Sequence, residues 1–316
     1  MNYILELKNA LGNWKVLENV SMRDYTTFRV GGAADVLIDV YEEQDVILAI
    51  RILKKYDIPY LVIGNGSNLI VRDDGIEGAV INLGKHFSAI AEPVAQPKIA
   101  PDVYHLVSLS GALLSSVAAT ALDNDLADMS EIAGIPGSVG GAVYMNAGAY
   151  GGEVKDSLYE VKVYDTEKDD VAVYQKDALD LSYRHSMLFE NPNLIILSVV
   201  WQLRKGTVEE LQTIKSKYED YAQRRRDKQP LDKPSAGSFF KRPPGLFAGQ
   251  LIQEAGLKGL RVGDAQISDK HAGFVVNLGD ATSQDILDLA AVAQATVLES
   301  AGVLLEIEPM IIGRNI

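Results

Sequence analysis

Five small residues, Gly64-Asn65-Gly66-Ser67-Asn68, separate two apolar, strand-like runs and constrain the fold of this chain more than any other segment. The runs are Tyr60 to Ile63 and Leu69 to Val71, so the backbone must turn sharply between them. Glycine permits positive φ and a close approach to a ligand, and serine and asparagine add hydrogen bonds to anionic oxygens. The segment is therefore either a phosphate-binding loop or a hairpin turn, because Asn-Gly is also typical of two-residue hairpins.

Two familiar nucleotide-binding motifs do not fit this loop. A dinucleotide fingerprint needs a third small residue followed by a helix, but Leu69 occupies that place and an apolar run follows. A P-loop would close with Gly-Lys-Ser or Gly-Lys-Thr, and the loop contains neither tripeptide. A phosphate site here would therefore belong to a different fold.

A second glycine-rich run has the sequence Gly134-Ile135-Pro136-Gly137-Ser138-Val139-Gly140-Gly141. It is either an irregular connection between a helix and a strand or a second cradle for a long diphosphate cofactor. Two such loops, each carrying small hydroxyl or amide side chains, favour a dinucleotide bound between domains.

Bulk properties exclude several classes of function. No apolar run approaches the roughly 18 residues of a membrane span, and the N-terminus has no basic leader, so we expect a cytoplasmic protein without a membrane partner. The chain has no cysteine, and its four histidines are far apart, so neither a disulfide nor a metal site is expected. A net charge of −13 argues against nucleic-acid binding. Residues 224–242 are an exception, with seven Lys and Arg against two Asp, and form either a small-polyanion site or a solvated charge run.

Hydrophobic periodicity predicts α+β units along the chain. In the first 85 residues it predicts a helix around Val46 to Leu53 and strands at 35–40, 60–63, 69–72 and 79–82. Further along it predicts a helix over 110–123, a hairpin of strands 159–164 and 171–174, and a strand over 194–203. The last part is predicted to contain a helix starting at the Thr207/Glu210 capping box, a helix ending at Gly256, a strand at 274–278, a helix from Thr282 to Gly302 and a strand over 303–312.

Ser238 lies in a third informative segment, Ser235 to Pro243, between Gly237 and two phenylalanines and beside two cations. No Gly-x-Ser-x-Gly elbow surrounds Ser238, which argues against a nucleophilic serine of the serine-hydrolase type. Ser238 is therefore either a proton donor or substrate ligand in an apolar wall, or a turn serine beside core phenylalanines.

Six blocks together resemble one flavoenzyme family. They are Thr27 to Gly32, Val62 to Asn68, Gly134 to Gly141, Tyr183 to Ser186, Ser235 to Lys241 and Lys270 to Asn277, in one order across nearly the whole chain. The chain resembles the UDP-N-acetylenolpyruvoylglucosamine reductase family of peptidoglycan precursor synthesis, in its shorter second type, because the stretch between Phe247 and Phe274 is short.

The resemblance implies an α+β chain of three parts. Residues 1–84 with 303–316, and residues 85–205, would be two FAD-binding subdomains of the vanillyl-alcohol-oxidase (PCMH) type, and residues 206–302 a UDP-sugar-binding domain. The implied reaction is NADPH-dependent reduction of UDP-N-acetylglucosamine enolpyruvate to UDP-N-acetylmuramate. FAD would be held non-covalently, the UDP-sugar would be the only partner, and the protein would be a monomer.

The resemblance also implies roles for individual residues. Arg184 would polarise the substrate carboxylate, Ser238 would be the proton donor, and Glu308 would complete the catalytic group. Glu306 is the alternative to Glu308, because both lie on one face of a predicted strand. Lys228, Lys241 and Arg242 would bind the UDP-sugar. FAD would be bound by Arg29, by Gly64, Asn65, Gly66, Ser67 and Asn68, and by Gly134, Ile135, Gly137, Ser138, Gly140 and Gly141.

Two rival functions follow from the same motifs. One is an alcohol oxidase on the same flavin fold, but such enzymes often tether flavin to histidine or cysteine, and neither residue lies in the glycine loops. The other is a catalytically silent FAD or UDP-sugar binding protein, which would be expected to lose one of Arg184, Ser238 and Glu308. The sequence retains all three residue types.

Overall fold

The computed structural model describes residues 2–314, which form two compact units. Unit 1 comprises Met1–Val16, Ile38–Asn65 and Ile81–Ala222, and unit 2 comprises Leu17–Leu37, Gly66–Val80 and Gln223–Ile316. Each unit is therefore assembled from segments that are far apart in the sequence. Within residues 2–314, no helix is long and apolar enough to cross a membrane.

Unit 1 is built on a five-stranded antiparallel sheet in the order β11-β10-β12-β7-β6. These strands are β6 (Val94–Ala95), β7 (Val103–Leu109), β10 (Leu158–Asp165), β11 (Asp170–Gln175) and β12 (Leu194–Arg204). The unit also contains α1 (Tyr3–Leu11), α2 (Glu43–Lys55), α3 (Leu114–Asp123), α4 (Val139–Tyr144), α5 (Val154–Ser157), β3 (Tyr60–Ile63) and the short pair β8 (Gly148–Ala149) and β9 (Gly152–Glu153). Helix α6 (Val208–Lys228) begins in unit 1 and ends in unit 2.

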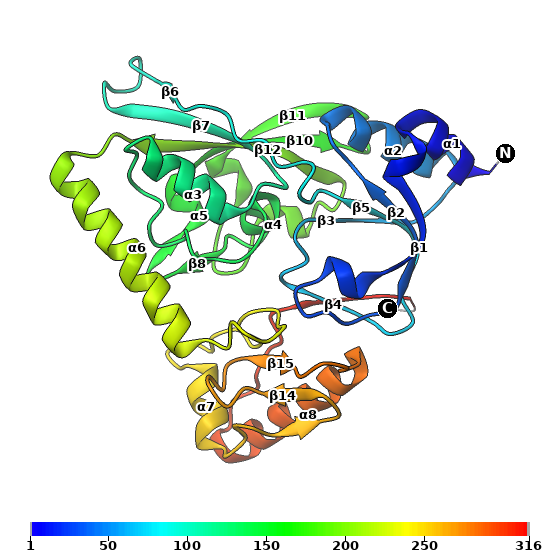
Figure 1. Ribbon diagram of the computed structural model, residues 1–316, viewed down its shortest axis with the longest axis vertical. Coiled ribbons are helices and arrows are strands. Elements are labelled where there is room, and N and C mark those ends of the chain that lie inside the picture. The colour runs from blue at the N-terminus through cyan, green and yellow to red at the C-terminus, as the bar shows by residue number, and fades with distance from the viewer. Residues whose placement is uncertain (1, 315–316) are drawn as a thin grey trace. The chain divides into compact units, whose positions relative to one another are not determined.

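The core of unit 1 lies between this sheet and helices α3, α4 and α5, which cover one of its faces (Figure 1). Trp201 on β12 is fully buried there, and its indole nitrogen donates to the Ser108 hydroxyl on β7 at 2.9 Å. This bond satisfies the one polar atom that the indole brings into the core. The sheet is thereby a fixed support for the loops around α4 and α5.

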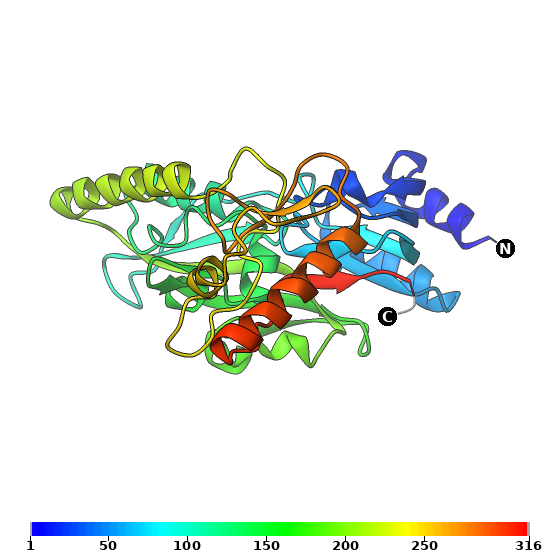
Figure 2. The same ribbon diagram turned by 90° about the horizontal axis from the view of Figure 1, so that it is seen from below.

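Unit 2 contains α8 (Ser283–Ala301), packed against α7 (Ala248–Glu254) and against a small antiparallel sheet, as Figures 1 and 2 show. The sheet consists of β13 (Arg261–Val262), β14 (Ala265–Ile267) and β15 (Val275–Asn277). The unit also holds most of β1 (Val16–Ser21), and the parallel pair β4 (Leu69–Val71) and β16 (Met310–Ile312). Strands β2 (Ala33–Asp39) and β5 (Ile76–Asn82) run from unit 2 into unit 1, and the strand order is β1-β2-β5-β3.

Most predicted elements are confirmed, and the helix ends follow their local signals. Helix α8 starts with the capping box of Thr282 and Asp285 and stops at Gly302, which adopts a left-handed φ of 69°. Helix α6 likewise starts with reciprocal bonds between Thr207 and Glu210. The helix predicted over 110–123 is shorter, because residues before Leu114 form a loop, in which Ser110 N donates to Leu197 O and Ala112 O accepts from Val139 N.

At the strand level, the structure excludes one of the two alternatives for the first loop and corrects one prediction. The hairpin alternative for Gly64 to Asn68 is excluded, because β3 neighbours β5 whereas β4 pairs with β16. The predicted strand over 303–312 is a regular strand only at Met310–Ile312. Pro309 has no N–H for a ladder, and the preceding residues make single bonds instead, from Lys241 N to Glu306 O and from Glu308 N to Phe239 O.

Candidate functional site

The two glycine-rich runs meet in unit 1 at Gly64 and Ser138. A Cβ placed on Gly64 would lie 2.0 Å from the Ser138 hydroxyl oxygen and 3.0 Å from its Cβ. Ser138 is buried directly before α4, and an isolated β-bridge to Leu113 holds it through bonds of the flanking residues, from Leu114 N to Gly137 O and from Val139 N to Ala112 O. Glycine is therefore required at position 64 by sterics, since any side chain would enter the space of the second loop.

Further backbone crowding surrounds this contact. Gly140 N donates to Ser110 O at 2.7 Å, and a Cβ on Gly140 would lie 3.0 Å from the Ser110 Cβ. A Cβ on Gly111 would lie 2.4 Å from the carbonyl oxygens of Leu83 and Phe87. Among the residues described, the Ser110 hydroxyl is one of few buried side-chain polar atoms that make no hydrogen bond within the protein. A tightly packed, glycine-lined surface with an unsatisfied hydroxyl is suited to bring backbone close to a ligand.

The rest of the second run lies around this point. Ile135 packs, partly buried, against the core of unit 1, and Gly137 has a φ of 149° and accepts a bond from Leu114 N at 3.0 Å. Gly134 and Gly141 are exposed. The run therefore combines anchored residues with an accessible glycine backbone.

The second half of the first loop, from Gly66 onward, belongs to unit 2. Gly66 has a φ of 60°, and a Cβ there would lie 2.1 Å from the Tyr25 carbonyl oxygen. Thr26, beside this contact, is buried, and its hydroxyl makes no hydrogen bond within the described protein. Ser67 is half-buried, and the carbonyl of Asn68 accepts from Met310 N at 2.9 Å. The loop is thus anchored to the segment that carries Glu308.

Arg184 occupies a tight turn in unit 1. Ser182 and His185 exchange backbone hydrogen bonds of 3.1 and 3.2 Å, and Arg184 has a left-handed φ of 56°. Its guanidinium lies 4.9 Å from the centre of the Tyr183 ring and donates to Gly148 O at 3.4 Å. Because left-handed backbone is unfavourable for residues other than glycine, the surrounding bonds must hold this turn.

Asn146 connects the Arg184 turn to the β8–β9 pair, and the sequence analysis assigned it no role. Its side-chain nitrogen donates to the Ser182 carbonyl at 3.0 Å and to the Glu153 carboxylate at 3.1 Å. Its side-chain oxygen accepts from Lys155 N at 3.1 Å. Burial alone would raise the pKa of Glu153, but the hydrogen bonds from Lys155 and Asn146 outweigh it and hold that pKa below its usual value. The only sequence signal for Asn146 was its position at the start of the glycine-containing stretch 146–152, two residues after α4.

Ser238 lies in unit 2 between two extended segments. It forms an isolated β-bridge with Phe274, and its neighbour Phe239 donates to Gly273 O at 2.9 Å and accepts from Glu308 N at 2.9 Å. Phe239 and Phe240 are buried in the core of unit 2, as expected, whereas Ser238 itself is exposed. The phenylalanines point into the core and leave the Ser238 side chain at the surface of unit 2.

Glu306 and Glu308 differ in their surroundings although they are two residues apart. Glu306 is exposed and its carboxylate pairs with Lys241 Nζ at 3.2 Å. Glu308 is half-buried, and its carbonyl accepts from the Asn68 side chain at 3.4 Å. Glu308 therefore shares unit 2 and a hydrogen-bonded backbone with Ser238 and the first glycine loop, while Glu306 is engaged with a lysine at the surface.

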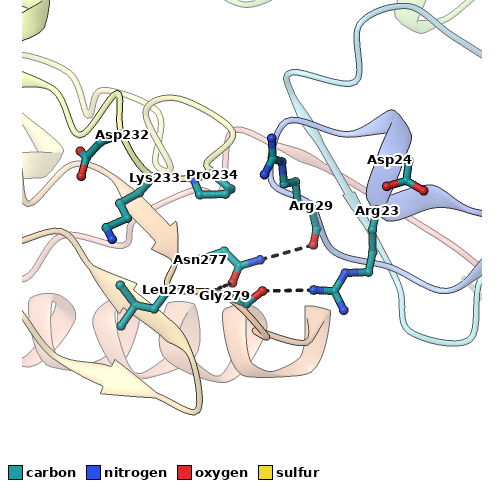
Figure 3. A pocket seen from close by; sticks show the side chains of 9 residues that line it. All are labelled: Arg23, Asp24, Arg29, Asp232, Lys233, Pro234, Asn277, Leu278 and Gly279. Carbon is teal, nitrogen blue, oxygen red and sulfur yellow. Dashed lines mark hydrogen bonds between the residues drawn. The ribbon is translucent and has the colours of Figure 1, made fainter.

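Arg29 borders a cavity of about 420 Å³ in unit 2, shown in Figure 3. Its backbone adopts a φ of 57°, and its carbonyl accepts from the side-chain nitrogen of the buried Asn277 at 3.3 Å. Arg23 lies on the same side of the cavity, where it donates to Gly279 O at 3.1 Å, and Lys233 lies opposite (Figure 3). Three cationic side chains at one cavity favour an anionic ligand, although Asp24 and Asp232 partly compensate them.

The remaining cations predicted to bind substrate lie at the surface of unit 2. Lys228 is the exposed last residue of α6, and the Arg242 guanidinium stacks over the Phe247 ring at 4.0 Å.

His271 lies against Gly249 and Gly273, and its Nδ1 accepts from Gly273 N at 3.0 Å. Burial lowers the pKa of His271, and the charges of Lys258 and Lys228 lower it further. Because Nδ1 accepts the bond from Gly273 N, the neutral form of the ring carries its proton on Nε2.

The predicted site residues divide between the two units. Unit 1 brings together the first half of the first loop and the second glycine-rich run, and it also holds Arg184. Unit 2 brings Ser238, Glu308 and Asn68 into one hydrogen-bonded set and also holds Arg29, Lys228, Lys241 and Arg242. Among residues 2–314, no three or more histidine, aspartate or glutamate side chains lie close enough together to hold a metal ion.

Two domain families match this chain. Residues 34–168 match an FAD binding domain, and residues 229–312 match the UDP-N-acetylenolpyruvoylglucosamine reductase, C-terminal domain. The expected α+β architecture, with an FAD-binding part followed by a separate C-terminal domain, is confirmed.

Several known proteins are similar over nearly the whole chain. A UDP-N-acetylenolpyruvoylglucosamine reductase of Agathobacter rectalis is 46% identical, covering 98% of both chains. One of Clostridium novyi is 43% identical, covering 98% of this chain and 96% of its own. The crystal structure of UDP-N-acetylenolpyruvylglucosamine reductase from Thermus caldophilus superposes with a TM-score of 0.73 at 34% identity, covering 94% of this chain and 97% of that one.

Proposed function

The chain belongs to the UDP-N-acetylenolpyruvoylglucosamine reductase family, and from this premise we propose that it reduces UDP-N-acetylglucosamine enolpyruvate to UDP-N-acetylmuramate with NADPH as the hydride donor. The observation that carries the proposal is full-length similarity together with retention of Arg184, Ser238 and Glu308. The product is a precursor of peptidoglycan, so the protein would act in the cytoplasm. We propose that it acts as a monomer.

The glycine-lined surfaces fit a bound FAD. In unit 1, Gly64 and Gly140 pack closely against Ser138 and Ser110, and the buried Ser110 hydroxyl makes no bond within the described residues. In unit 2, the buried Thr26 hydroxyl beside Gly66 likewise makes no such bond. These features suit the diphosphate and ribityl part of a flavin dinucleotide. Residues Gly64 to Asn68, Gly134 to Gly141 and Arg29 would hold the cofactor without a covalent link. When bound, FAD supplies hydride transfer from NADPH to the methylene carbon of the enolpyruvyl ether.

Arg184 is proposed to contact and polarise the substrate carboxylate. Addition of hydride to the methylene carbon places negative charge on the neighbouring carbon and on the carboxylate attached to it. A guanidinium can contact a carboxylate through two parallel N–H donors, and such contacts strengthen as charge develops. The ring of Tyr183 and the carbonyl of Gly148 fix the guanidinium at the turn, which is the pre-organisation that this role requires.

Ser238 is assigned protonation of the carbon next to the carboxylate. The backbone at Ser238 and Phe239 is held on one side by the Gly273–Phe274 segment and on the other by Glu308 N. The position of the Ser238 Cα, from which the hydroxyl extends, is therefore fixed. The side chain is exposed in the protein alone, and the bound substrate and cofactor would provide the exclusion of water. Glu308 would complete the proton-transfer group, while the pairing of Glu306 with Lys241 argues against Glu306.

The UDP part of the substrate is proposed to bind to three cations, Lys228, Lys241 and Arg242. They lie on the basic segment 224–242 of an otherwise acidic chain, where their field would draw in a polyanion. The proposed domain limits remain 1–84 with 303–316 and 85–205 for FAD, and 206–302 for the UDP-sugar. Residues 1, 315 and 316 of these limits lie outside the described part of the chain.

A three-step measurement tests the proposed function. The purified protein should be yellow, NADPH should bleach its visible flavin absorption, and the enolpyruvyl UDP-sugar should then restore the colour while UDP-N-acetylmuramate appears by mass spectrometry. A colourless protein that cannot be reconstituted with FAD would remove the proposal. Bleaching of the flavin by a primary alcohol, followed by return of the colour with oxygen and no reduction of the enolpyruvyl ether, would instead favour an oxidase of the same fold.

A further inference from the structure

We propose that Asn146 is the positioning residue for Arg184, because its side-chain amide ties the turn that carries Arg184 to the β8–β9 pair that the guanidinium contacts. This inference rests on the proposed function, in which Arg184 contacts the substrate carboxylate. All of the residues involved lie in unit 1.

The amide of Asn146 uses both of its donors and its acceptor. The donors go to the Ser182 carbonyl at 3.0 Å and to Glu153 Oε2 at 3.1 Å, and the oxygen accepts from Lys155 N at 3.1 Å. Asn146 is fully buried, so these bonds are shielded from water. The Ser182 carbonyl belongs to the residue that closes the two-residue turn around Tyr183 and Arg184. The amide therefore fixes the start of the turn directly.

The other contacts of the turn complete the case. Ser186, directly after the turn, is also fully buried, and its hydroxyl donates to Tyr144 O at 2.6 Å. Tyr144 is the last residue of α4, two positions before Asn146. Both ends of the turn are thus tied to the same short stretch of chain after the second glycine-rich run. The Arg184 guanidinium then reaches Gly148 O, on the strand paired with Glu153.

Only asparagine satisfies the requirements of this position. An aspartate has the same shape but no donor for the Ser182 carbonyl, and its charge would face Glu153. A glutamine would move the amide by one methylene. Asn146 also has a positive φ of 39°, which asparagine tolerates better than most residues. A glycine would keep that backbone conformation while it removes all three side-chain bonds.

The test compares Asn146→Asp and Asn146→Gly with a matched control, Asn19→Gly. Asn19 is exposed and has a similar left-handed φ of 51°, so its replacement reports the effect of glycine at such a position without the side-chain network. In stopped-flow experiments on the FAD-loaded protein, NADPH should bleach the flavin at the wild-type rate in all variants. Restoration of colour by the enolpyruvyl substrate should slow about tenfold or more in both Asn146 variants. KM for NADPH should stay unchanged, and Asn19→Gly should match the wild type.

A double-mutant cycle separates positioning from general stability. In an Arg184→Lys background, Asn146→Asp should slow the same step by less than about threefold, because the group it positions is already impaired. Equal fold-changes in both backgrounds, or wild-type rates in both folded Asn146 variants, would overturn the inference. If the glycine variant fails to fold, the isosteric aspartate variant decides alone. A wild-type protein that does not reduce the enolpyruvyl ether would remove the proposed function, an outcome visible before any variant is made.

Discussion

The backbone of Gly64 faces the hydroxyl of Ser138 so closely that a methyl group on Gly64 would lie 2.0 Å from that oxygen. This contact joins two glycine-rich runs that are far apart in the sequence but are adjacent in unit 1. The contact explains why position 64 requires glycine, and it ties the conformation of one run to that of the other. Within unit 1, Gly64 and the second run therefore pack against each other as one surface.

Gly64→Ala is expected to destabilise the protein by about 1–3 kcal/mol, because the added methyl overpacks the contact with Ser138. It should also lower the amount of FAD that co-purifies, measured as the ratio of flavin to protein absorption. The matched double variant Gly64→Ala/Ser138→Ala removes the oxygen and should recover part of the stability in urea denaturation. Equal destabilisation in the single and double variants would show that the clash lies elsewhere.

Ser238→Ala is expected to slow substrate-driven restoration of the flavin colour by about 10²–10⁴-fold, the usual contribution of a positioned general acid. Bleaching by NADPH should be unaffected, since that step needs no proton from Ser238. Ser235→Ala is the control, because the bond from Thr27 to residue 235 uses the main-chain carbonyl and survives the change. Normal turnover of the Ser238 variant would exclude the proton-donor role.

Glu308→Gln and Glu306→Gln form a pair that identifies the catalytic carboxylate. The Glu308 variant should lose about 10²-fold or more in turnover, whereas the Glu306 variant should lose only its ion pair with Lys241. An exposed ion pair contributes about 0–1 kcal/mol, so little change in stability is expected for Glu306→Gln. Steady-state kinetics on both variants suffices, and the reverse order of effects would reassign the role to Glu306.

His271 should make stability depend on pH. Burial and the nearby lysines lower its pKa in the folded protein, so below about pH 6.5 the unfolded state binds more protons than the folded state. Stability is therefore expected to fall as pH decreases from about 6.5 through the lowered pKa, and His271→Asn should flatten this part of the profile in urea denaturation. An NMR titration of the His271 ring that gives a pKa at or above about 6.5 would contradict the prediction.

Asp45 is expected to be a large contributor to the stability of unit 1. Lys15 Nζ lies 2.7 Å from both of its carboxylate oxygens, and both side chains are buried. Asp45→Ala should cost about 3–5 kcal/mol because it leaves a buried, uncompensated lysine. Adding Lys15→Met should restore part of that loss in urea denaturation. A double variant no more stable than Asp45→Ala alone would point to the lost backbone bonds from Tyr41 and Glu42 instead.

Local signals in the sequence were sufficient for several elements, including α8 and β10, and for the choice of motifs. The capping box at Thr282 and the glycine at 302 bound α8, because each acts within one helical turn. The alternation of Val161 and Val163 with polar residues likewise predicted β10, whose buried face carries both valines. The six sequence blocks pointed to the family for the same reason, since each block is a contiguous stretch.

The sequence alone identified the candidate residues for the chemistry, through motifs that resemble one enzyme family. Only the tertiary structure decided which of them meet: β4 pairs with β16, Gly64 with Ser138, and Asn146 with the Arg184 turn. It also decided that Ser238 is exposed while Phe239 is buried. The physical reason is that helix caps and turns depend on interactions within a few residues. Pairing between distant segments depends instead on burial and hydrogen bonding over the whole unit, which no short window of sequence contains.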